Sequence, residues 1–261
     1  MFRAVVHCAS RHHELKLSPP TEAAEIRALL LDVEGTTTPI DFVFKTLFPF
    51  ASDRAEDFLR RHSQNAEING LIDQLQESWS THQSNGAPQR NEETAGGRIA
   101  SAAAYVRWLA ARDSKLTPLK ILQGRIWEEG FRNGELRGEV YRDVAPAFAR
   151  WAAQGRSIAI FSSGSVLAQR LLFAHSTAGD LTSFLHGYFD TTTGPKREAE
   201  SYRKIAESIC VPPRAVLFVS DVGEELDAAL AAGMKTGHSL RPGIPELAEK
   251  RHPEIRSFDD I

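Results

Sequence analysis

The sequence of 261 residues has little cysteine and no long apolar run. Its two cysteines, Cys8 and Cys210, are too few for a disulfide framework, and this scarcity is typical of a chain in a reducing compartment. No apolar stretch approaches the ~20 residues that a membrane-spanning helix needs. We therefore expect a cytoplasmic protein with no membrane segment.

The chain also lacks an excess of either charge. It has 31 Lys and Arg residues against 34 Asp and Glu residues, a formal net charge of -3. Binding to nucleic acid or to an anionic membrane leaves a strongly basic footprint, which this balance does not show. Nucleic acid and membrane surfaces are thus not expected as partners, and small molecules remain.

Residues 1–24 are unlike the rest, with basic residues early and no acid before Glu14. A targeting peptide shares this bias, but the apolar patch is too short for a secretory signal. We expect a disordered tail or an upstream start codon. His7, His12 and His13 could bind a metal, and in a loose tail we expect that they do not.

Short apolar runs predict strands that are buried on both faces. They lie at residues 26–33, 157–163 and 215–221, with further short strands expected at 185–191 and 235–241. Helical spacing fills the gaps between the later runs. Strands that alternate with helices predict βαβ units, and hence an α/β fold with a doubly wound, Rossmann-like parallel sheet.

The region from residue 42 to 137 has a different character, with four stretches of helical spacing and no convincing strand. It predicts an all-helical cap inserted after the first strand. The expected organisation is a tail at 1–24, an α/β core at 25–41 and 138–261, and a helical cap at 42–137.

Polar residues end three of the predicted strands, at 32–36, 162–165 and 220–221. In doubly wound folds, ligands bind outside the carboxyl ends of the strands. The Asp32 carboxylate could attack a phosphoryl group and form an aspartyl-phosphate, provided that a cation screens the two anions. Mg²⁺ prefers oxygen ligands, which Asp32 and Asp221 could supply.

Glu34 follows Asp32 by two residues, so its side chain points the same way if the backbone stays extended. It could protonate the leaving oxygen and then activate water. Gly35 would let the backbone turn closely beneath the phosphate. The alternative is that Asp32 and Glu34 cap a following helix, and this motif by itself does not decide between the two.

The other polar positions near the strand ends also have an ordinary alternative, as helix caps or solvated side chains. Ser162 and Ser163 lie between a strand and a helix, where hydroxyl and N–H groups bind phosphate well. Lys196 could hold the phosphate, and Glu225 could brace either the metal ligands or Lys196. All of these groups occur in order at the predicted edge with Asp221, which favours a phosphate and metal site over independent caps.

The series Asp32-Val-Glu-Gly-Thr36, then Ser162 or Ser163, Lys196, and Asp221 with Glu225 resembles the signature of the haloacid dehalogenase superfamily. The helical insertion after the first motif matches the position of that superfamily's C1-type cap. Longer stretches, LLLDVEGTTTPIDFV, SSGSVLAQRLLFAHS and LFVSDVGEELDAALAAGM, resemble its enolase-phosphatases of methionine salvage. The resemblance covers about residues 26–261.

The resemblance implies a bifunctional enzyme. It would enolise 2,3-diketo-5-methylthiopentyl-1-phosphate and then release phosphate to give 1,2-dihydroxy-3-keto-5-methylthiopentene. It also implies a monomer with one Mg²⁺ per chain. Carried over by motif, Asp32, Glu34 and Lys196 would be catalytic. The implied metal ligands are Asp32, Glu34 (through its carbonyl) and Asp221, and the implied substrate contacts are Ser162, Ser163 and Lys196.

Several alternatives stay open at this point. The chain could be a phosphatase of this superfamily for another sugar or keto phosphate, a binding protein without catalysis, or a receiver-type signalling domain. The four intact charged positions argue against the second, and the long helical insertion argues against the third. The enolisation base could be Glu34 or a cap residue. Phe42, Phe44 or Trp127 could recognise the methylthio tail, although we expect them in the core.

Overall fold

The structure is a computed structural model that describes residues 25–261 apart from 83–85, 92, 113 and 249. The predictions made for residues 1–24, including those for His7, His12 and His13, lie outside the described residues. Where the structure describes the chain, no helix is both long enough and apolar enough to span a bilayer.

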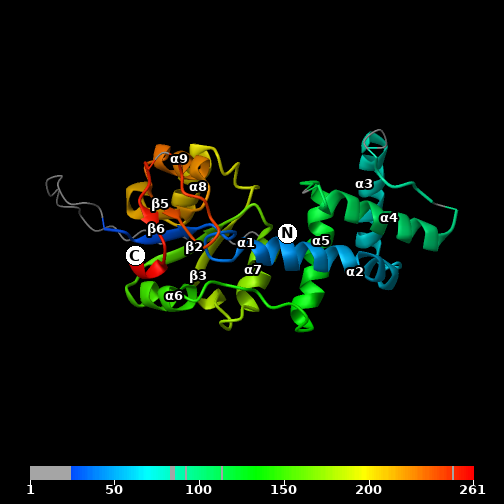
Figure 1. Ribbon diagram of the computed structural model, residues 1–261, viewed down its shortest axis with the longest axis horizontal. Helices are drawn as coiled ribbons and strands as arrows, with labels where there is room; N and C mark the ends of the chain where they lie inside the picture. The colour runs from blue at the N-terminus through cyan, green and yellow to red at the C-terminus, as the bar shows by residue number, and fades with distance from the viewer. Residues whose placement is uncertain (1–24, 83–85, 92, 113, 249) are drawn as a thin grey trace. The chain divides into compact units, whose positions relative to one another are not determined.

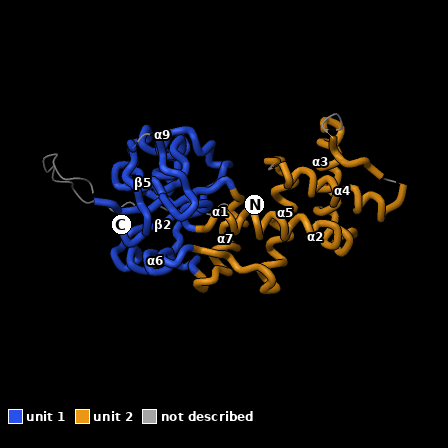
Figure 2. Tube along the Cα trace, viewed as in Figure 1, with its two compact units in different colours: residues 1–37, 141–163, 181–261 blue, residues 38–140, 164–180 orange. Residues whose placement is uncertain are grey.

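The chain divides into two compact units (Figure 2). The first, called here the sheet unit, consists of those residues within 1–37, 141–163 and 181–261 that the structure describes. The second, the helical unit, takes those of 38–140 and 164–180. The domain boundaries expected from the sequence assigned 38–41, 138–140 and 164–180 to the core, whereas this division places them in the helical unit. Those expected boundaries stay a prediction.

The sheet unit contains one six-stranded sheet in the order β3-β2-β1-β4-β5-β6, with every neighbouring pair parallel. This confirms the predicted doubly wound α/β fold. The strands are β1 Ala28–Leu31, β2 Ser157–Phe161, β3 Leu185–Phe189, β4 Val216–Ser220, β5 Lys235–Ser239 and β6 Glu254–Ile255. The sequence did not predict β6, because two residues carry no recognisable periodicity.

The register of the three central strands decides where their polar ends lie. Leu31 of β1 pairs with Ile160 of β2 on one side and with Val219 of β4 on the other. β1 therefore ends one residue before the level at which β2 ends at Phe161 and β4 ends at Ser220. Asp32, which follows β1, is level with Ser220, and Ser162 follows β2 at the same edge.

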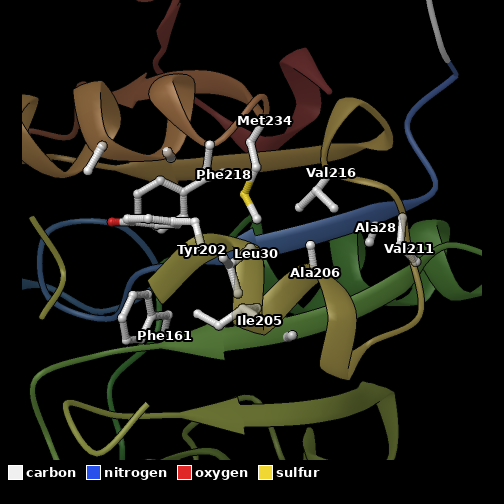
Figure 3. Close-up of a cluster of buried hydrophobic side chains, with 14 of the residues drawn as sticks. Ala28, Leu30, Phe161, Tyr202, Ile205, Ala206, Val211, Val216, Phe218 and Met234 are labelled. Carbon is white, nitrogen blue, oxygen red and sulfur yellow. The ribbon is translucent and has the colours of Figure 1, made fainter. Parts of the chain in front are cut away.

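Helices cover both faces of this sheet, with α8 and α9 on one side and α6 on the other (Figure 1). They are α6 Val144–Ala153, α8 Ala199–Ser208 and α9 Gly223–Ala231, with 3-10 turns at Thr182–Phe184, Pro213–Ala215 and Phe258–Asp260. Apolar side chains fill the layer under α8 and α9 (Figure 3). At its centre the Tyr202 ring packs edge-on against Phe161 and Phe218, with centroids 5.5 and 5.0 Å away.

The helical unit confirms the four helical stretches expected between residues 42 and 137. Its helices are α1 Ile40–Phe42, the π-helical turn η1 Val43–Leu47, α2 Phe48–Arg61, α3 Ala66–His82, α4 Ala95–Ala110, α5 Thr117–Arg132 and α7 Val166–Ala174. Each long helix buries one stripe; in α5 it includes Leu119, Leu122 and Ile126, spaced by three and four residues.

Candidate active site

Asp32 lies directly after β1, and its side chain is only 4% exposed. The Val33 N–H donates to Asp32 Oδ1 at 2.8 Å, and the Thr37 hydroxyl donates to the Asp32 carbonyl at 3.2 Å. The helix that follows begins at Ile40 and has Pro39 as its N-cap. Neither Asp32 nor Glu34 is therefore a helix cap, and the ordinary explanation for this acidic pair is excluded.

Lys196 is the cation of the site. Its Nζ lies 2.7 Å from Asp32 Oδ1 and 2.6 Å from Glu225 Oε2, and the side chain is 6% exposed. Burial would lower the pKa of Lys196, but the carboxylates of Asp32 and Glu225 outweigh it and raise the pKa. The Tyr202 hydroxyl donates to the Lys196 carbonyl at 2.6 Å, which ties the loop of this lysine to the core. The raised pKa favours the ammonium form of Lys196 and suits it to act as a cation.

Ser220, the last residue of β4, connects two of the carboxylates. Its hydroxyl oxygen lies 3.3 Å from Asp32 Oδ2 and 3.0 Å from Glu225 Oε2. Burial, together with the charge of Asp32, raises the pKa of Glu225 to about 7. Glu225 braces Lys196, one of the two roles that the sequence left open. Ser220 itself had no predicted role, although a polar residue that ends an apolar strand is a signal that could have identified it.

Glu34 is held from β2, because the Ser162 hydroxyl donates to Glu34 Oε2 at 3.3 Å. Burial and then the charge of Asp32 raise the pKa of Glu34, so the side chain tends to keep its proton. The N-cap of α7 is Ser165, whose hydroxyl accepts from Ala168 N–H. Ser162 is therefore not the cap of this helix. Ser163, the other predicted substrate contact, is exposed.

Asp221 and Gly35 lie against each other. Gly35 has φ +69°, and a Cβ at this position would collide with the Asp221 carboxylate. Only glycine therefore allows the loop to pass so close. Burial and then Asp32 raise the pKa of Asp221 to about 7. The N-cap of α9 is Val222, so Asp221 is not a cap either.

The donor set can be tested against a divalent cation. Among the described residues, no cluster of three His, Cys, Asp or Glu side chains forms a ready-made metal site. Two carboxylates, Asp32 and Asp221, with the Glu34 carbonyl are instead suited to a hard cation that keeps waters and takes a substrate phosphate oxygen. The acids Asp32, Glu34, Asp221 and Glu225 surround Lys196, and their repulsion contributes to the raised pKa of Asp221 and Glu34. This surplus of negative charge fits Mg²⁺.

Three features together indicate one class of hydrolase: the fold, the acidic loop after β1, and the edge of the sheet where Ser162 and Lys196 could bind a phosphate group. The haloacid dehalogenase-like hydrolase family matches residues 26–233 of the chain. The chain belongs to the haloacid dehalogenase-like hydrolases.

Relatives narrow the assignment. The chain is 50% identical over 236 residues to Enolase-phosphatase E1 of Synechococcus elongatus, covering 90% of this chain and 98% of the relative. It is 45% identical to Enolase-phosphatase E1 of Drosophila grimshawi, covering 89% and 94% of the two chains. Within the hydrolases, the chain belongs to the enolase-phosphatase E1 family.

One solved structure is also similar over most of the chain. The UTR4 protein of Saccharomyces cerevisiae superposes with a TM-score of 0.73 at 31% identity, covering 91% of this chain and 100% of that one. The likeness extends over both units, so the sheet with its helical insertion is shared by the two proteins.

Proposed function

We propose that this enzyme converts 2,3-diketo-5-methylthiopentyl-1-phosphate to 1,2-dihydroxy-3-keto-5-methylthiopentene and phosphate, as a step of methionine salvage. We further expect it to act as a cytoplasmic monomer. One observation supports the chemistry above all. The buried Asp32 carboxylate has an ammonium group 2.7 Å away, while Glu34, an acid that tends to keep its proton, lies on the same loop.

In the phosphatase step, Asp32 acts as nucleophile. A carboxylate oxygen of Asp32 attacks phosphorus, the bond between phosphorus and the substrate oxygen breaks, and the Glu34 proton passes to that oxygen. The Glu34 carboxylate then removes a proton from water, which attacks the aspartyl-phosphate and restores Asp32. Lys196 and Ser162 are suited to hold phosphate oxygens during both transfers, because one supplies a charge and the other a hydroxyl donor.

Mg²⁺ would be held by Asp32, Asp221 and the Glu34 carbonyl. When bound, it neutralises charge on the phosphoryl group and so lowers the barrier to attack by an anion. The protein's own part is to keep the two carboxylates close despite their repulsion. The glycine at position 35 and the surrounding hydrogen bonds achieve this.

The enolisation step needs a base beside a carbonyl group of the substrate. The raised pKa of Lys196 argues against that residue as the base and suits it to stabilise an enolate as a cation. Glu34 in its ionised form remains the candidate within the sheet unit, and a cap residue remains the alternative.

The methylthio tail requires an accessible apolar surface. Of the three aromatic residues considered, Phe42 is 2% exposed and Trp127 is 8% exposed within the helical unit. Phe44 is 52% exposed, on the π-helical turn η1. The expectation that these residues lie in the core is therefore confirmed for Phe42 and Trp127 and wrong for Phe44, whose ring is the most accessible of the three.

The proposal is tested by following enediol absorbance and free phosphate together, with Mg²⁺ and then with EDTA. Both signals should rise, and both should be lost with EDTA. Asp32→Asn should reduce phosphate release by at least about 1000-fold, since the nucleophile is removed. Asp57→Asn, an exposed acid on α2, serves as the matched control.

Two results would contradict the proposal. Near-normal turnover by Asp32→Asn would exclude Asp32 as the nucleophile. Phosphate release from generic esters without turnover of the diketo phosphate would leave a phosphatase of this fold with another substrate.

A further inference from the structure

Two side chains from the end of β5 hold the loop that carries the proposed nucleophile. The Ser239 hydroxyl donates to the Gly35 carbonyl at 2.9 Å. Arg241 Nε donates to the Thr36 carbonyl at 3.2 Å. Both side chains are buried, and both lie more than 200 residues away along the chain from the carbonyl that they contact. Neither belongs to the motifs from which the site was predicted.

Arg241 is itself fixed on several sides. Its guanidinium carbon lies 4.5 Å from the centroid of the Tyr141 ring and 4.6 Å from that of Phe258. Its Nη1 donates to Asp143 Oδ2 at 2.7 Å. The two rings and the Asp143 carboxylate form a clamp around Arg241. This clamp fixes the orientation of the guanidinium plane, so that Nε points at the loop.

Such an arrangement is costly if it serves packing alone. Arg241 is 5% exposed, and its Nη2 has no hydrogen-bond partner among the residues that the structure describes. Burying a charged group with an unsatisfied donor is unfavourable, and apolar residues of similar volume are often at least as stable. What an apolar residue cannot supply is a directed donor to the Thr36 carbonyl.

The position of these carbonyls matters because Gly35 lies against the Asp221 carboxylate. If the loop shifted, Gly35 would move relative to Asp221, and Asp32 at the start of the loop would move with it. Outer contacts of this kind are known to orient metal-binding groups. The hydrogen bonds from β5 therefore bear on the distance between the two carboxylates.

We propose that Ser239 and Arg241 are positioning residues that hold the loop of residues 33–37 so that Asp32 and Asp221 can share one Mg²⁺. The proposal rests on the proposed function for the metal. It assigns no contact with substrate to either side chain.

Ser239→Ala and Arg241→Lys test it, with Thr236→Val as the matched control. Thr236 lies on the same strand, is buried, and has its hydroxyl 2.8 Å from His252 Nδ1, away from the loop. Hydrogen–deuterium exchange should be faster at the amides of residues 33–37 in both test variants and unchanged there in Thr236→Val. Titration calorimetry without substrate should show Mg²⁺ affinity weakened about 10-fold in the test variants only.

Unchanged loop exchange in Ser239→Ala would overturn the proposal, as would faster exchange with wild-type Mg²⁺ affinity. If Arg241→Lys does not fold, Ser239→Ala still decides, because it removes one hydroxyl and leaves the clamp intact. If the unsubstituted protein binds no Mg²⁺, the proposed function of the metal is wrong, while the exchange comparison still decides whether β5 holds the loop.

Discussion

Two ion pairs of the same length lie in the two units of this protein. Lys196 Nζ and Glu225 Oε2 are 2.6 Å apart at the edge of the sheet, and Arg98 Nη2 and Asp73 Oδ1 are 2.6 Å apart on the helical unit. The side chains of the first pair are 6% and 10% exposed, against 35% and 62% for the second. The distance between the charged atoms therefore does not show how much an ion pair contributes to stability. The exposure of the two side chains to water decides that contribution.

The difference has a direct electrostatic cause. Water screens the exposed pair, so the attraction between its two charges contributes little to the free energy of unfolding. At the sheet edge the charges are buried and weakly screened: burial lowers the pKa of Lys196, but the carboxylates of Asp32 and Glu225 outweigh it and raise this pKa. Burial, and then the charge of Asp32, raise the pKa of Glu225 and of Asp221. Removing one buried partner should thus have a large effect, and removing one exposed partner a small one.

The largest effect is expected for Lys196→Met. Phosphate release should fall about 100- to 1000-fold, since a cation beside the transferred phosphoryl group is lost. The free energy of unfolding should fall by about 3–5 kcal/mol, because Asp32 and Glu225 stay buried without their counter-charge. Lys250→Met, at a side chain 68% exposed, is the control.

The stability loss of Lys196→Met should depend on pH. An acid whose folded pKa is raised binds a proton in the folded state at a pH where the unfolded chain has released it. Stability therefore decreases as pH rises from the unfolded pKa of Glu225 to its folded pKa. Lys196 lowers the pKa of Glu225 in the wild type, so in the variant the folded pKa should be higher still and this decrease larger. Urea unfolding at about pH 5 and about pH 8 should show the larger deficit at the higher pH. An equal deficit at both would contradict the role assigned to the buried carboxylates.

Glu34→Gln should slow both halves of the phosphatase reaction, since it removes the acid of the first half and the base of the second. An enol oxygen leaves without a proton more readily than water attacks without a base, so hydrolysis of the aspartyl-phosphate should slow more, by about 100- to 10,000-fold, and the phosphorylated chain should accumulate. Intact-mass spectrometry after mixing with substrate would detect it, with Asp32→Asn as the variant that cannot form it. Absence of any phosphorylated chain would count against Glu34 as the base for water.

Asp143→Asn should have a smaller effect, on stability. Burial alone would raise the pKa of Asp143, but the Phe258 N–H and Arg241 outweigh it and lower the pKa. We expect a loss of about 3 kcal/mol. In the wild type, the contribution of Asp143 is present above its ordinary pKa and is lost as pH falls through the lowered folded value. Unfolding curves of both proteins should therefore converge in strong acid, and a constant gap would disprove this.

The smallest effect is expected for Asp73→Asn. The pair with Arg98 is exposed, so the free energy of unfolding should change by no more than about 0.5 kcal/mol. Thermal unfolding with and without added salt would measure it. A loss comparable to that of Lys196→Met would show that burial does not explain the difference between the two pairs.

Much of the site could be predicted because its main groups follow strand ends. Asp32, Ser162, Lys196 and Asp221 each follow or precede an element with a strong periodic pattern, and the register of β1, β2 and β4 brings the ends of these strands within one residue of each other. The functions of Ser239 and Arg241 could not be predicted. Each acts on a residue more than 200 positions away in the chain, and no local pattern records such a contact.

The choice among the serines shows the same limit. From the sequence, Ser162 and Ser163 were each a possible helix cap or phosphate ligand. Only the backbone conformation decided that Ser165 is the cap of α7 and that Ser162 donates to Glu34. A hydroxyl serves whichever partner the fold places within about 3 Å, and the sequence does not contain that distance.

The sequence by itself determined the strands β1 to β5, the longer helices, the inserted helical region and the order of the charged groups, because apolar periodicity and strand-end chemistry are local properties. The tertiary structure alone decided which charges pair, which pKa values shift, and which distant side chains hold the loop after β1. These depend on burial and on distances between segments. Both arise only when parallel strands place residues from remote parts of the chain along one edge of the sheet.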